Sequence, residues 1–439
     1  LFIFSFFFFF VLNGKTQEVE ILTLEDCLRI GIDNNLSLEG KRKEIQRSKY
    51  GVSENRSKLL PQINAIAGYN NNFDPPVSVT DGSSYGVPYN ITQTLQHSAN
   101  AGLEMQMPLF NQTLYTSMSI AKVMEEISRL SYGKAREDVI LQISKMYYLG
   151  QVTAEQIMLI KANITRLEEL RDITQAFFDN GMSMEVDLKR VNINLENLKV
   201  QYDNAQAMMK QQLNMLKYIM DYPAEKEIAL TPVNTDSITT VALTGLSENI
   251  YELQLSQSQV QLAERQKKII TNGYIPSLSL TGSWRYAAYT DKGYHWFHSG
   301  PSNQWFRSYG VGLTLRIPIF DGLDKTYKIK KAMIDIENKR LAWEDARKNL
   351  QTQYLNAVND LMNNQRNFKK QKDNYLLAED VYAVTSDRYR EGIASMTEVL
   401  QDEMQMSEAQ NNYISAHYNY RVTNLMLLKL TGQIESLVK

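Results

Sequence analysis

Two long stretches without proline constrain this chain more than any other feature of its sequence. The ten prolines lie at positions 61, 75, 76, 88, 108, 223, 232, 276, 301 and 318. Residues 109–222 and 319–439 therefore contain none. Each stretch has only three glycines and is rich in Lys, Glu, Gln, Leu, Met and Ala, which favour helices. Because proline breaks helix interiors, the pattern predicts two very long helical regions.

Hydrophobic periodicity supports these helices. In the second stretch, apolar side chains recur at steps of seven, at Tyr354, Leu361, Phe368, Tyr375, Tyr382 and Tyr389. In the first stretch, the spacing of Ile157, Ile160, Ile164 and Leu167 is that of a coiled-coil seam. Polar residues at other seam positions, such as Asn364 and Gln371, make a simple dimeric coiled coil less favourable. They suit a looser wall of several helices.

One glycine interrupts each stretch. Turns at Asn180–Gly181 and Glu391–Gly392 would fold the stretches into helical hairpins at 112–222 and 323–430. The long arms would cover about 112–179 and 323–390, and each would measure roughly 100 Å at ~1.5 Å per residue. Helices of this length exceed the diameter of an ordinary globular domain.

Four short segments alternate between apolar and polar residues, as strands with two different faces do. We expect strands at about 62–73, 97–109, 276–290 and 306–319. Two interpretations compete: the apolar faces form a soluble sandwich core, or they meet lipid in an outer-membrane barrel. Strand length, two long polar loops at 74–96 and 291–306 and an export signal favour the barrel. Its aqueous lumen would then be lined by Glu104, Arg285 and Arg316.

A barrel interpretation requires several subunits. Four strands cannot close a useful barrel, and an open sheet edge is not tolerated in lipid. Several copies of the chain would therefore share one barrel.

The N-terminus predicts export. Residues 1–12 contain eleven apolar residues and Ser5, which is typical of the hydrophobic region of a secretory signal and too short to span a bilayer. We expect a signal peptide at 1–17, truncated because no basic segment precedes the apolar run. A buried N-terminal helix or strand is the alternative, disfavoured because five consecutive phenylalanines would promote aggregation.

The two halves of the chain repeat each other at a spacing of about 210–215 residues. Leu60-Pro61 precedes the first strand as Ile275-Pro276 precedes the third, and Met105–Asn111 matches Leu315–Asp321. Each half predicts helix, strand, loop, strand, long helix, turn and return helix. We expect a first repeat at 18–222, a linker at 223–248 and a second repeat at 249–439.

This ordered set of elements resembles the TolC family of outer-membrane efflux proteins. The resemblance covers about residues 20–436 and rests on the duplication, the strand-boundary prolines, the two tip glycines and the Leu24–Leu28 opening helix. It implies a mainly α fold with a membrane β-barrel portion: a homotrimer whose sheets close one twelve-stranded barrel on a periplasmic α-helical barrel. The linker and the chain ends would form an equatorial belt around it.

The resemblance also implies a function. The chain would be the outer-membrane exit duct of a tripartite efflux or type I secretion system. Its partners would be outer-membrane lipid, a periplasmic adaptor and an inner-membrane pump or ABC transporter. The alternative is a non-channel protein, either the periplasmic adaptor itself or a coiled-coil scaffold.

The same resemblance places the functional residues at the hairpin tips. Acidic residues that ring the closed pore in the family correspond here to Glu398 and Gln401, with Asp402 beside them. The pair that holds the tip closed corresponds to Asp187 and Tyr389. The companion arginine of the family is replaced by Ala394. The adaptor would meet the turns at Asn180, Gly181, Met182, Glu391, Gly392 and Ile393.

The remaining composition argues against other functions. Lys and Arg total 47 and Asp and Glu total 49, so the net charge of −2 argues against a nucleic-acid binder. No phosphate loop, Cys/His dyad or HExxH motif is present, so we expect no enzyme and no cofactor. Asp291, His295 and His298 lie close together but fit an external loop rich in aromatic residues better than a metal site. The 18 methionines fit packing between helices better than metal export.

Overall fold

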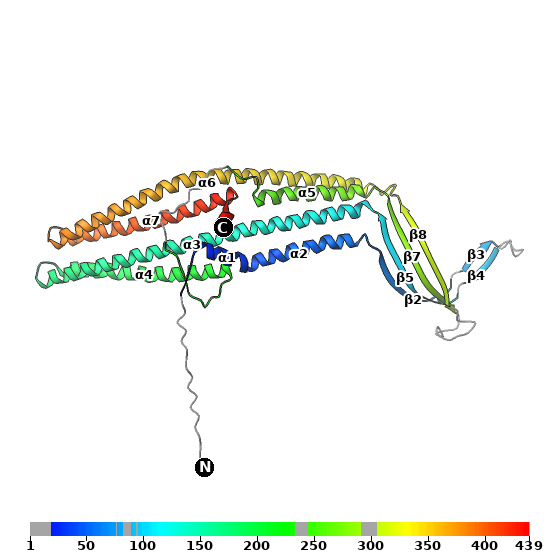
Figure 1. Ribbon diagram of the computed structural model, residues 1–439, viewed down its shortest axis with the longest axis horizontal. Coiled ribbons are helices and arrows are strands. Elements are labelled where there is room, and N and C mark those ends of the chain that lie inside the picture. Colours follow the sequence, from blue (N-terminus) through cyan, green and yellow to red (C-terminus); the bar gives the residue numbers. More distant parts are fainter. Residues whose placement is uncertain are drawn as a thin grey trace, which may run out of the picture. The chain divides into compact units, whose positions relative to one another are not determined.

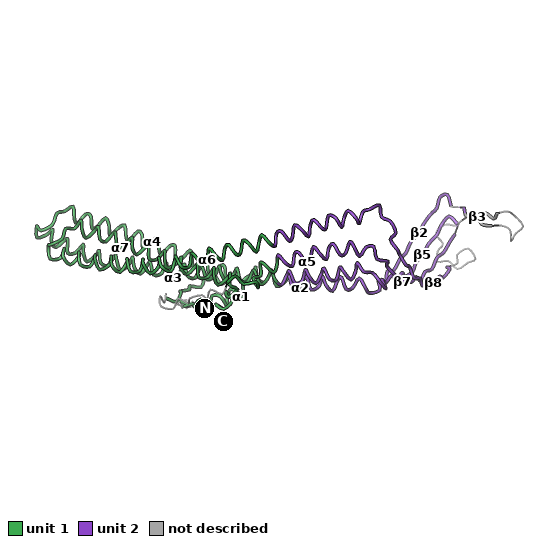
Figure 2. Tube along the Cα trace, turned by 90° about the horizontal axis from the view of Figure 1, so that it is seen from above, with its two compact units in different colours: residues 1–43, 130–255, 344–439 green, residues 44–129, 256–343 purple. Residues whose placement is uncertain are grey.

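The computed structural model describes residues 19–75, 77–81, 89–93, 95–232, 245–290 and 305–438. The predicted signal peptide, the three residues of the candidate metal cluster and much of the predicted linker lie outside these ranges. The chain divides into two compact units, coloured in Figure 2. The first comprises 1–43, 130–255 and 344–439, and the second comprises 44–129 and 256–343. Both predicted repeats contribute to both units. Among the described residues, no helix combines the length and apolar character needed to cross a bilayer.

The second unit contains a four-stranded antiparallel sheet (Figure 1). In spatial order its strands are β2 (Gln62–Asn71), β5 (His97–Phe110), β7 (Ser277–Thr290) and β8 (Trp305–Arg316). A separate hairpin pairs β3 (Val77–Asp81) with β4 (Tyr89–Gln93), within a segment expected to be a loop. The edges β2 and β8 have no second strand partner among the described residues.

The sheet has two chemically different faces. Residues that pair directly across strands share a face: Ser283 pairs with Glu104, and Ser277 pairs with Arg316. Arg285 is an even number of residues from both serines on β7, so Glu104, Arg285 and Arg316 lie on the same face. Arg285 forms an ion pair with Glu104. The opposite face is apolar, and on β8 it leaves Val311 and Leu313 exposed. Close packing fixes the register locally, because a Cβ on Gly102 would lie 2.3 Å from the Trp284 carbonyl oxygen.

The helices of the second unit lead out of this sheet. They are the end of α2 (Leu36–Ser57), the start of α3 (Gln112–Asp179), α5 (Tyr251–Asn272) and the start of α6 (Asp324–Arg390). The amide of Asn272 donates to the Thr116 hydroxyl over 2.6 Å, which joins α5 to α3. An ion pair of 2.8 Å between Arg340 and Glu264 joins α6 to α5.

The first unit is built mainly from the rest of α3 and α6 with their return helices, α4 (Glu185–Met220) and α7 (Met396–Leu430). The predicted seven-residue stripe of α6 turns inward: Leu361, Tyr382 and Tyr389 are buried. Phe368 and Tyr375 pack against Tyr413 of α7, with ring centroids 5.8 and 5.7 Å apart. The periodicity therefore marks a packed seam, as the sequence predicts.

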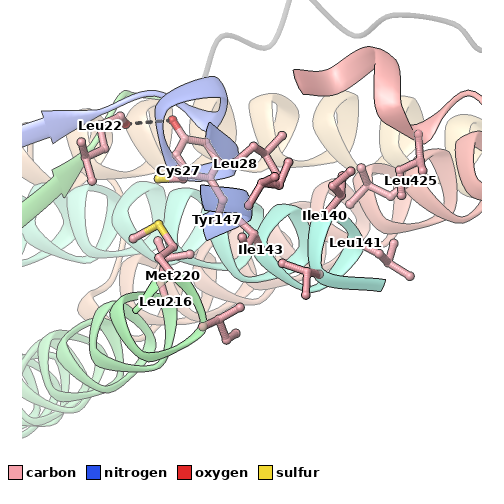
Figure 3. Packing of buried hydrophobic residues seen from close by; sticks show 14 of the residues in the cluster. Leu22, Cys27, Leu28, Ile140, Leu141, Ile143, Tyr147, Leu216, Met220 and Leu425 are labelled. Atoms are coloured by element: carbon pink, nitrogen blue, oxygen red, sulfur yellow. Dashed lines mark hydrogen bonds between the residues drawn. The ribbon is translucent and has the colours of Figure 1, made fainter. Parts of the chain in front are cut away.

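A second core of this unit lies where the N-terminal segments pack on α3 (Figure 3). It contains α1 (Leu24–Asn34), the parallel pair β1 (Glu20–Leu22) and β6 (Ile228–Leu230), and the short helix η2 (Ile434–Val438). Thr23 and Asp26 form a capping box at the start of α1. The Tyr147 hydroxyl donates to the Leu22 carbonyl over 3.2 Å. Burial raises the pKa of the Cys27 thiol to about 12, so this thiol is unreactive at neutral pH.

Candidate functional site

Each hairpin has one turn between its two helices, and the two turns have the same geometry. Gly181 and Gly392 both adopt a left-handed backbone, with φ of 72° and 75°. In each turn the glycine N–H donates to the carbonyl three residues before it, and the next N–H donates to the carbonyl five residues before it. This is a Schellman motif, which favours glycine because a Cβ would be strained there. The sequence duplication is thus repeated in the detailed geometry of the tips.

Beneath the turns, all four helices contribute to one apolar cluster, which we call the tip cluster. Its buried members are Leu167, Leu170, Val191, Leu195, Leu198, Tyr382, Tyr389, Met396, Val399, Leu400 and Met406. The two hairpins therefore meet through side chains and not only through the chain connection. Separation of the hairpins at this end would expose the tip cluster to water. This exposure costs free energy and therefore opposes the separation.

The structure corrects the predicted contact between Tyr389 and Asp187. Tyr389 is buried, its ring centroid lies 5.7 Å from that of Phe177, and its hydroxyl donates to the Thr174 hydroxyl over 3.3 Å. Asp187 instead accepts from Arg190 over 3.2 Å, one turn along α4. Within the protomer the two residues form no hydrogen bond, because Tyr389 points into the tip cluster toward α3 while Asp187 is held by its own helix.

The three candidate pore residues lie in the first two turns of α7. Glu398 is exposed, and its carboxylate accepts from the Ser395 backbone N–H over 2.8 Å. The Ser395 hydroxyl in turn accepts from the Glu398 N–H, which completes a capping box. Gln401 is exposed and Asp402 is half-buried. Glu398 therefore has a local structural role, and its charge remains directed to the surface of the protomer.

The tip turns themselves are open to solvent. Asn180, Gly181, Glu391 and Gly392 are exposed, and so are two apolar side chains, Met182 at 71% and Ile393 at 63%. The side chain of Asn180 donates to the Ala176 carbonyl over 2.7 Å, which further fixes the first turn. Both turns present a rigid backbone with an exposed apolar residue directly after the glycine.

Sequence reasoning missed a row of buried polar side chains on α7. Glu403, Gln410, His417 and Asn424 recur at seven-residue steps and are all buried, and we call them the polar ladder. Gln410 accepts from the Asn163 amide over 2.7 Å, and His417 Nδ1 lies 3.3 Å from a Glu155 oxygen. These partners lie on α3. The 3-4 spacing of buried positions, beginning at Met396, Val399 and Glu403, could have revealed the ladder.

Glu403 stands closest to the tips and is only 5% exposed. Burial raises the pKa of its carboxyl, and the nearby positive charge of Arg166 offsets part of that effect. Arg166 also lies over the Tyr382 ring, 6.0 Å from its centroid, and forms an ion pair with Glu379 at 3.4 Å. A carboxyl whose pKa is raised by burial is therefore part of the packing beneath the tip turns.

This arrangement gives the helical region a pH dependence. A carboxyl whose pKa is raised on folding stabilises the fold below its unfolded pKa, and that contribution is lost as pH rises through the folded pKa. We expect Glu403→Gln, which resembles the protonated acid, to raise the thermal melting temperature at pH 8 and to leave it nearly unchanged at pH 4. Melting curves at both pH values check this, with the exposed Glu398→Gln as the control. Equal effects of Glu403→Gln at both pH values would contradict it.

Comparison with known proteins gives consistent results. A family profile described as outer membrane efflux protein matches residues 30–220 and 242–433. The chain is 21% identical to the outer membrane protein TolC of Vibrio cholerae over 399 residues, which covers 87% of this chain and 84% of that protein. It is 23% identical to a probable efflux pump outer membrane protein, TtgC, of Pseudomonas putida, over 96% of this chain and 85% of that protein.

Solved structures share the fold. The crystal structure of CusC superposes with a TM-score of 0.77 at 16% identity, covering 93% of this chain and 91% of that one. The open state of the MtrE outer membrane channel of Neisseria gonorrhoeae gives a TM-score of 0.74 at 17% identity, over 93% of this chain and 88% of that one. At these identities the superpositions establish the fold.

Proposed function

The chain belongs to the outer membrane efflux protein family, and on this premise we propose that three copies form one continuous duct, gated at the helical tips. It is an outer-membrane protein that acts as an efflux channel, as its family and relatives are. The finer points form the proposal: the trimer, the adaptor and pump that it meets, the absence of any catalytic activity, and the residues that gate it.

The observation that carries the proposal is the open sheet. Its edges β2 and β8 are unpaired among the described residues, and one of its faces is apolar and exposed. Such edges are not tolerated in lipid unless another strand satisfies their backbone groups. Pairing β8 of one copy with β2 of the next satisfies both, and three copies of four strands give twelve. Glu104, Arg285 and Arg316 would then face the water-filled lumen.

Two unpartnered helical stripes support the same assembly. On α4, Val186, Ile193 and Val200 recur at seven-residue steps and are exposed. On α6, exposed apolar side chains recur in one heptad register at Leu355, Met362 and Leu376. Within the first unit these helices lie at opposite edges (Figure 1). Two different edges that bind each other generate a closed ring when the rotation fits.

The tip turns are the proposed docking surface for the adaptor. Their exposed Met182 and Ile393 offer apolar contacts beside a rigid backbone. A helical hairpin of a periplasmic adaptor would fit this pattern, since it could align with the coiled hairpins of the duct. The inner-membrane pump or ABC transporter would connect through that adaptor.

For the aperture we propose that three copies of Glu398 favour cations at the closed end, with Gln401 and Asp402 beside them. The substitution Glu398→Gln removes the charge but keeps the helix cap, because glutamine also completes a capping box. We expect it to lower the cation-to-anion permeability ratio in a planar bilayer about 2–5-fold, since each lost carboxylate weakens the local negative potential.

The matched control is Ser395→Ala. It removes the cap, at a cost of about 1 kcal/mol, but no charge. It should therefore leave the permeability ratio unchanged. A permeability ratio that is the same in Glu398→Gln and the parent protein would remove Glu398 from the aperture.

A direct test separates the duct from a coiled-coil scaffold. The duct should require detergent for extraction, migrate as a trimer and form discrete conductance steps in a planar bilayer. A monomer that is soluble in buffer and does not conduct would reject the proposed function.

A further inference from the structure

Positive charge is concentrated where the helices leave the sheet. We define the basic collar as the thirteen residues at each of the four helix ends beside the sheet, namely 49–61, 110–122, 264–276 and 319–331. It contains 11 Lys and Arg against 4 Asp and Glu, a net charge of +7. The rest of the chain has 36 against 45, a net charge of −9. Most of the collar's acids are already paired: Glu54 with Lys58, Asp321 with Lys325 and Asp324 with Lys328.

A groove between α5 and α6 begins in this collar and extends beyond it along α6. Its volume is about 960 Å³, and three lysines line it: Lys267, Lys268 and Lys330. Met333 and Ile334 give it an apolar portion. Of its other charged residues, Arg340 and Glu264 neutralise each other in their ion pair, which leaves Glu337 as the acid facing the lysines. The groove is thus amphipathic and has a surplus of positive charge.

The three lysines have no ionic partner in the part of the chain that the structure describes. None of them forms a salt bridge with any residue that the structure describes. The Lys330 ammonium lies 5.6 Å from the centroid of the Tyr327 ring, which orients it without neutralising it. Lys268 and Lys330 are exposed and Lys267 is half-buried. Three ammonium groups that face one carboxylate, Glu337, leave a surplus of positive charge that favours an anion.

The three lysines of the groove lie within two turns of the helix ends beside the sheet. Ile319 and Phe320, between β8 and α6, are 93% and 81% exposed. Lys330 follows the start of α6 by six residues, which is ~9 Å along a helix. The polar headgroup layer on one side of a bilayer is roughly 5–8 Å thick. If the sheet is inserted in lipid, lysines at this height can reach the headgroups.

From these observations we propose that the groove between α5 and α6 binds the phosphate headgroup of an anionic glycerophospholipid of the adjacent leaflet. The proposal rests on the outer-membrane insertion described above. Lys267, Lys268 and Lys330 contact the phosphate, and Met333 and Ile334 contact the apolar part of the lipid. Lysine suits this role because it binds phosphate as a point charge, and each lysine near an anionic surface contributes measurably to binding.

The test compares two lipids on the purified full-length protein in mild detergent. Native mass spectrometry gives the dissociation constants of dioleoyl phosphatidylglycerol and dioleoyl phosphatidylcholine. We expect the parent protein to bind phosphatidylglycerol at least about tenfold more tightly. The variant Lys267→Gln/Lys268→Gln/Lys330→Gln should lose this preference to within about twofold. Higher salt should weaken the preference of the parent protein, because salt screens exposed charges.

The matched control is Lys369→Gln/Lys370→Gln/Lys372→Gln, which removes three lysines of the same α6 helix in the first unit. It should keep the lipid preference. An unchanged preference in the groove variant overturns the proposal. Abolition of phosphatidylglycerol binding by 10 mM inorganic phosphate also overturns it, because the groove would then bind free anions. If the triple variant does not assemble, the single substitutions Lys267→Gln and Lys268→Gln must each lower the preference or the proposal fails.

Conductance separates this inference from the proposed function. A parent protein that forms no pores in a planar bilayer contradicts the duct itself. A groove variant that conducts normally and retains the lipid preference contradicts only the lipid site.

Discussion

Replacing Ile193 with glutamate should dissociate the proposed trimer. In the protomer this side chain is 61% exposed and lies in the apolar stripe of α4, opposite the buried Val191, Leu195 and Leu198. The substitution therefore costs the isolated fold little. In an interface it would bury an unpaired carboxylate, which costs several kcal/mol at each of three contacts. Size-exclusion chromatography with light scattering in detergent should show monomers where the parent protein gives trimers.

The control for this experiment is Asn192→Glu. It adds the same charge to an exposed position of α4 that lies ~100° around the helix from the stripe, so it should leave the trimer intact. Met362→Glu, in the stripe of α6, should reproduce the effect of Ile193→Glu because the two stripes are proposed to bind each other. A trimer that tolerates both stripe substitutions would rule out these stripes as the subunit interface.

Replacing Tyr389 with alanine should hold the tips open. The side chain is buried in the tip cluster, against Phe177 and Thr174. Loss of a buried aromatic ring removes packing worth about 3–5 kcal/mol. The equilibrium between closed and separated hairpins would shift by a factor on the order of 10² or more. In a planar bilayer we expect a large rise in resting conductance, and in cells a greater sensitivity to large antibiotics.

Two milder substitutions distinguish the contribution of the Tyr389 ring from that of its hydroxyl group. Tyr389→Phe and Thr174→Val each remove the same 3.3 Å hydrogen bond, worth about 1 kcal/mol, so each should raise the leak only about fivefold. Asp187→Asn should have no effect on this contact, since Asp187 pairs with Arg190. A leak that rises with Asp187→Asn and with Tyr389→Phe, but not with Thr174→Val, would restore the direct lock expected from the family and contradict the contact with Thr174.

Much of the architecture was predictable because it depends on backbone periodicity. The absence of proline marked the long helices, and the α7 return helix begins a few residues after Gly392. Alternation placed Glu104, Arg285 and Arg316 on one face of the sheet, which the register confirms. The proposed contacts between subunits were not derivable in this way, because a helix with two apolar stripes, one buried and one exposed, looks only more hydrophobic in sequence.

The side-chain details at the tips were harder to predict. The Tyr389 partner was wrong because position relative to a glycine fixes the backbone and not the rotamer, and Thr174 is the hydroxyl that lies within reach. Glu398 could have been recognised as a capping residue from the Ser395-x-x-Glu398 spacing. The hairpin of β3 and β4 was missed because its segment is rich in turn-forming residues.

The polar ladder has a mechanical consequence. Its members meet unlike partners along α3: Glu403 faces the cationic Arg166, Gln410 faces the amide of Asn163, and His417 faces the carboxylate of Glu155. Sliding α7 along α3 by one heptad would put Gln410 beside Arg166 and leave Glu155 without its histidine. Translation would therefore break these three contacts, while a twist about the long axis keeps each pair within reach. We therefore expect the tips to open by a twist of the helices and not by sliding along their axis.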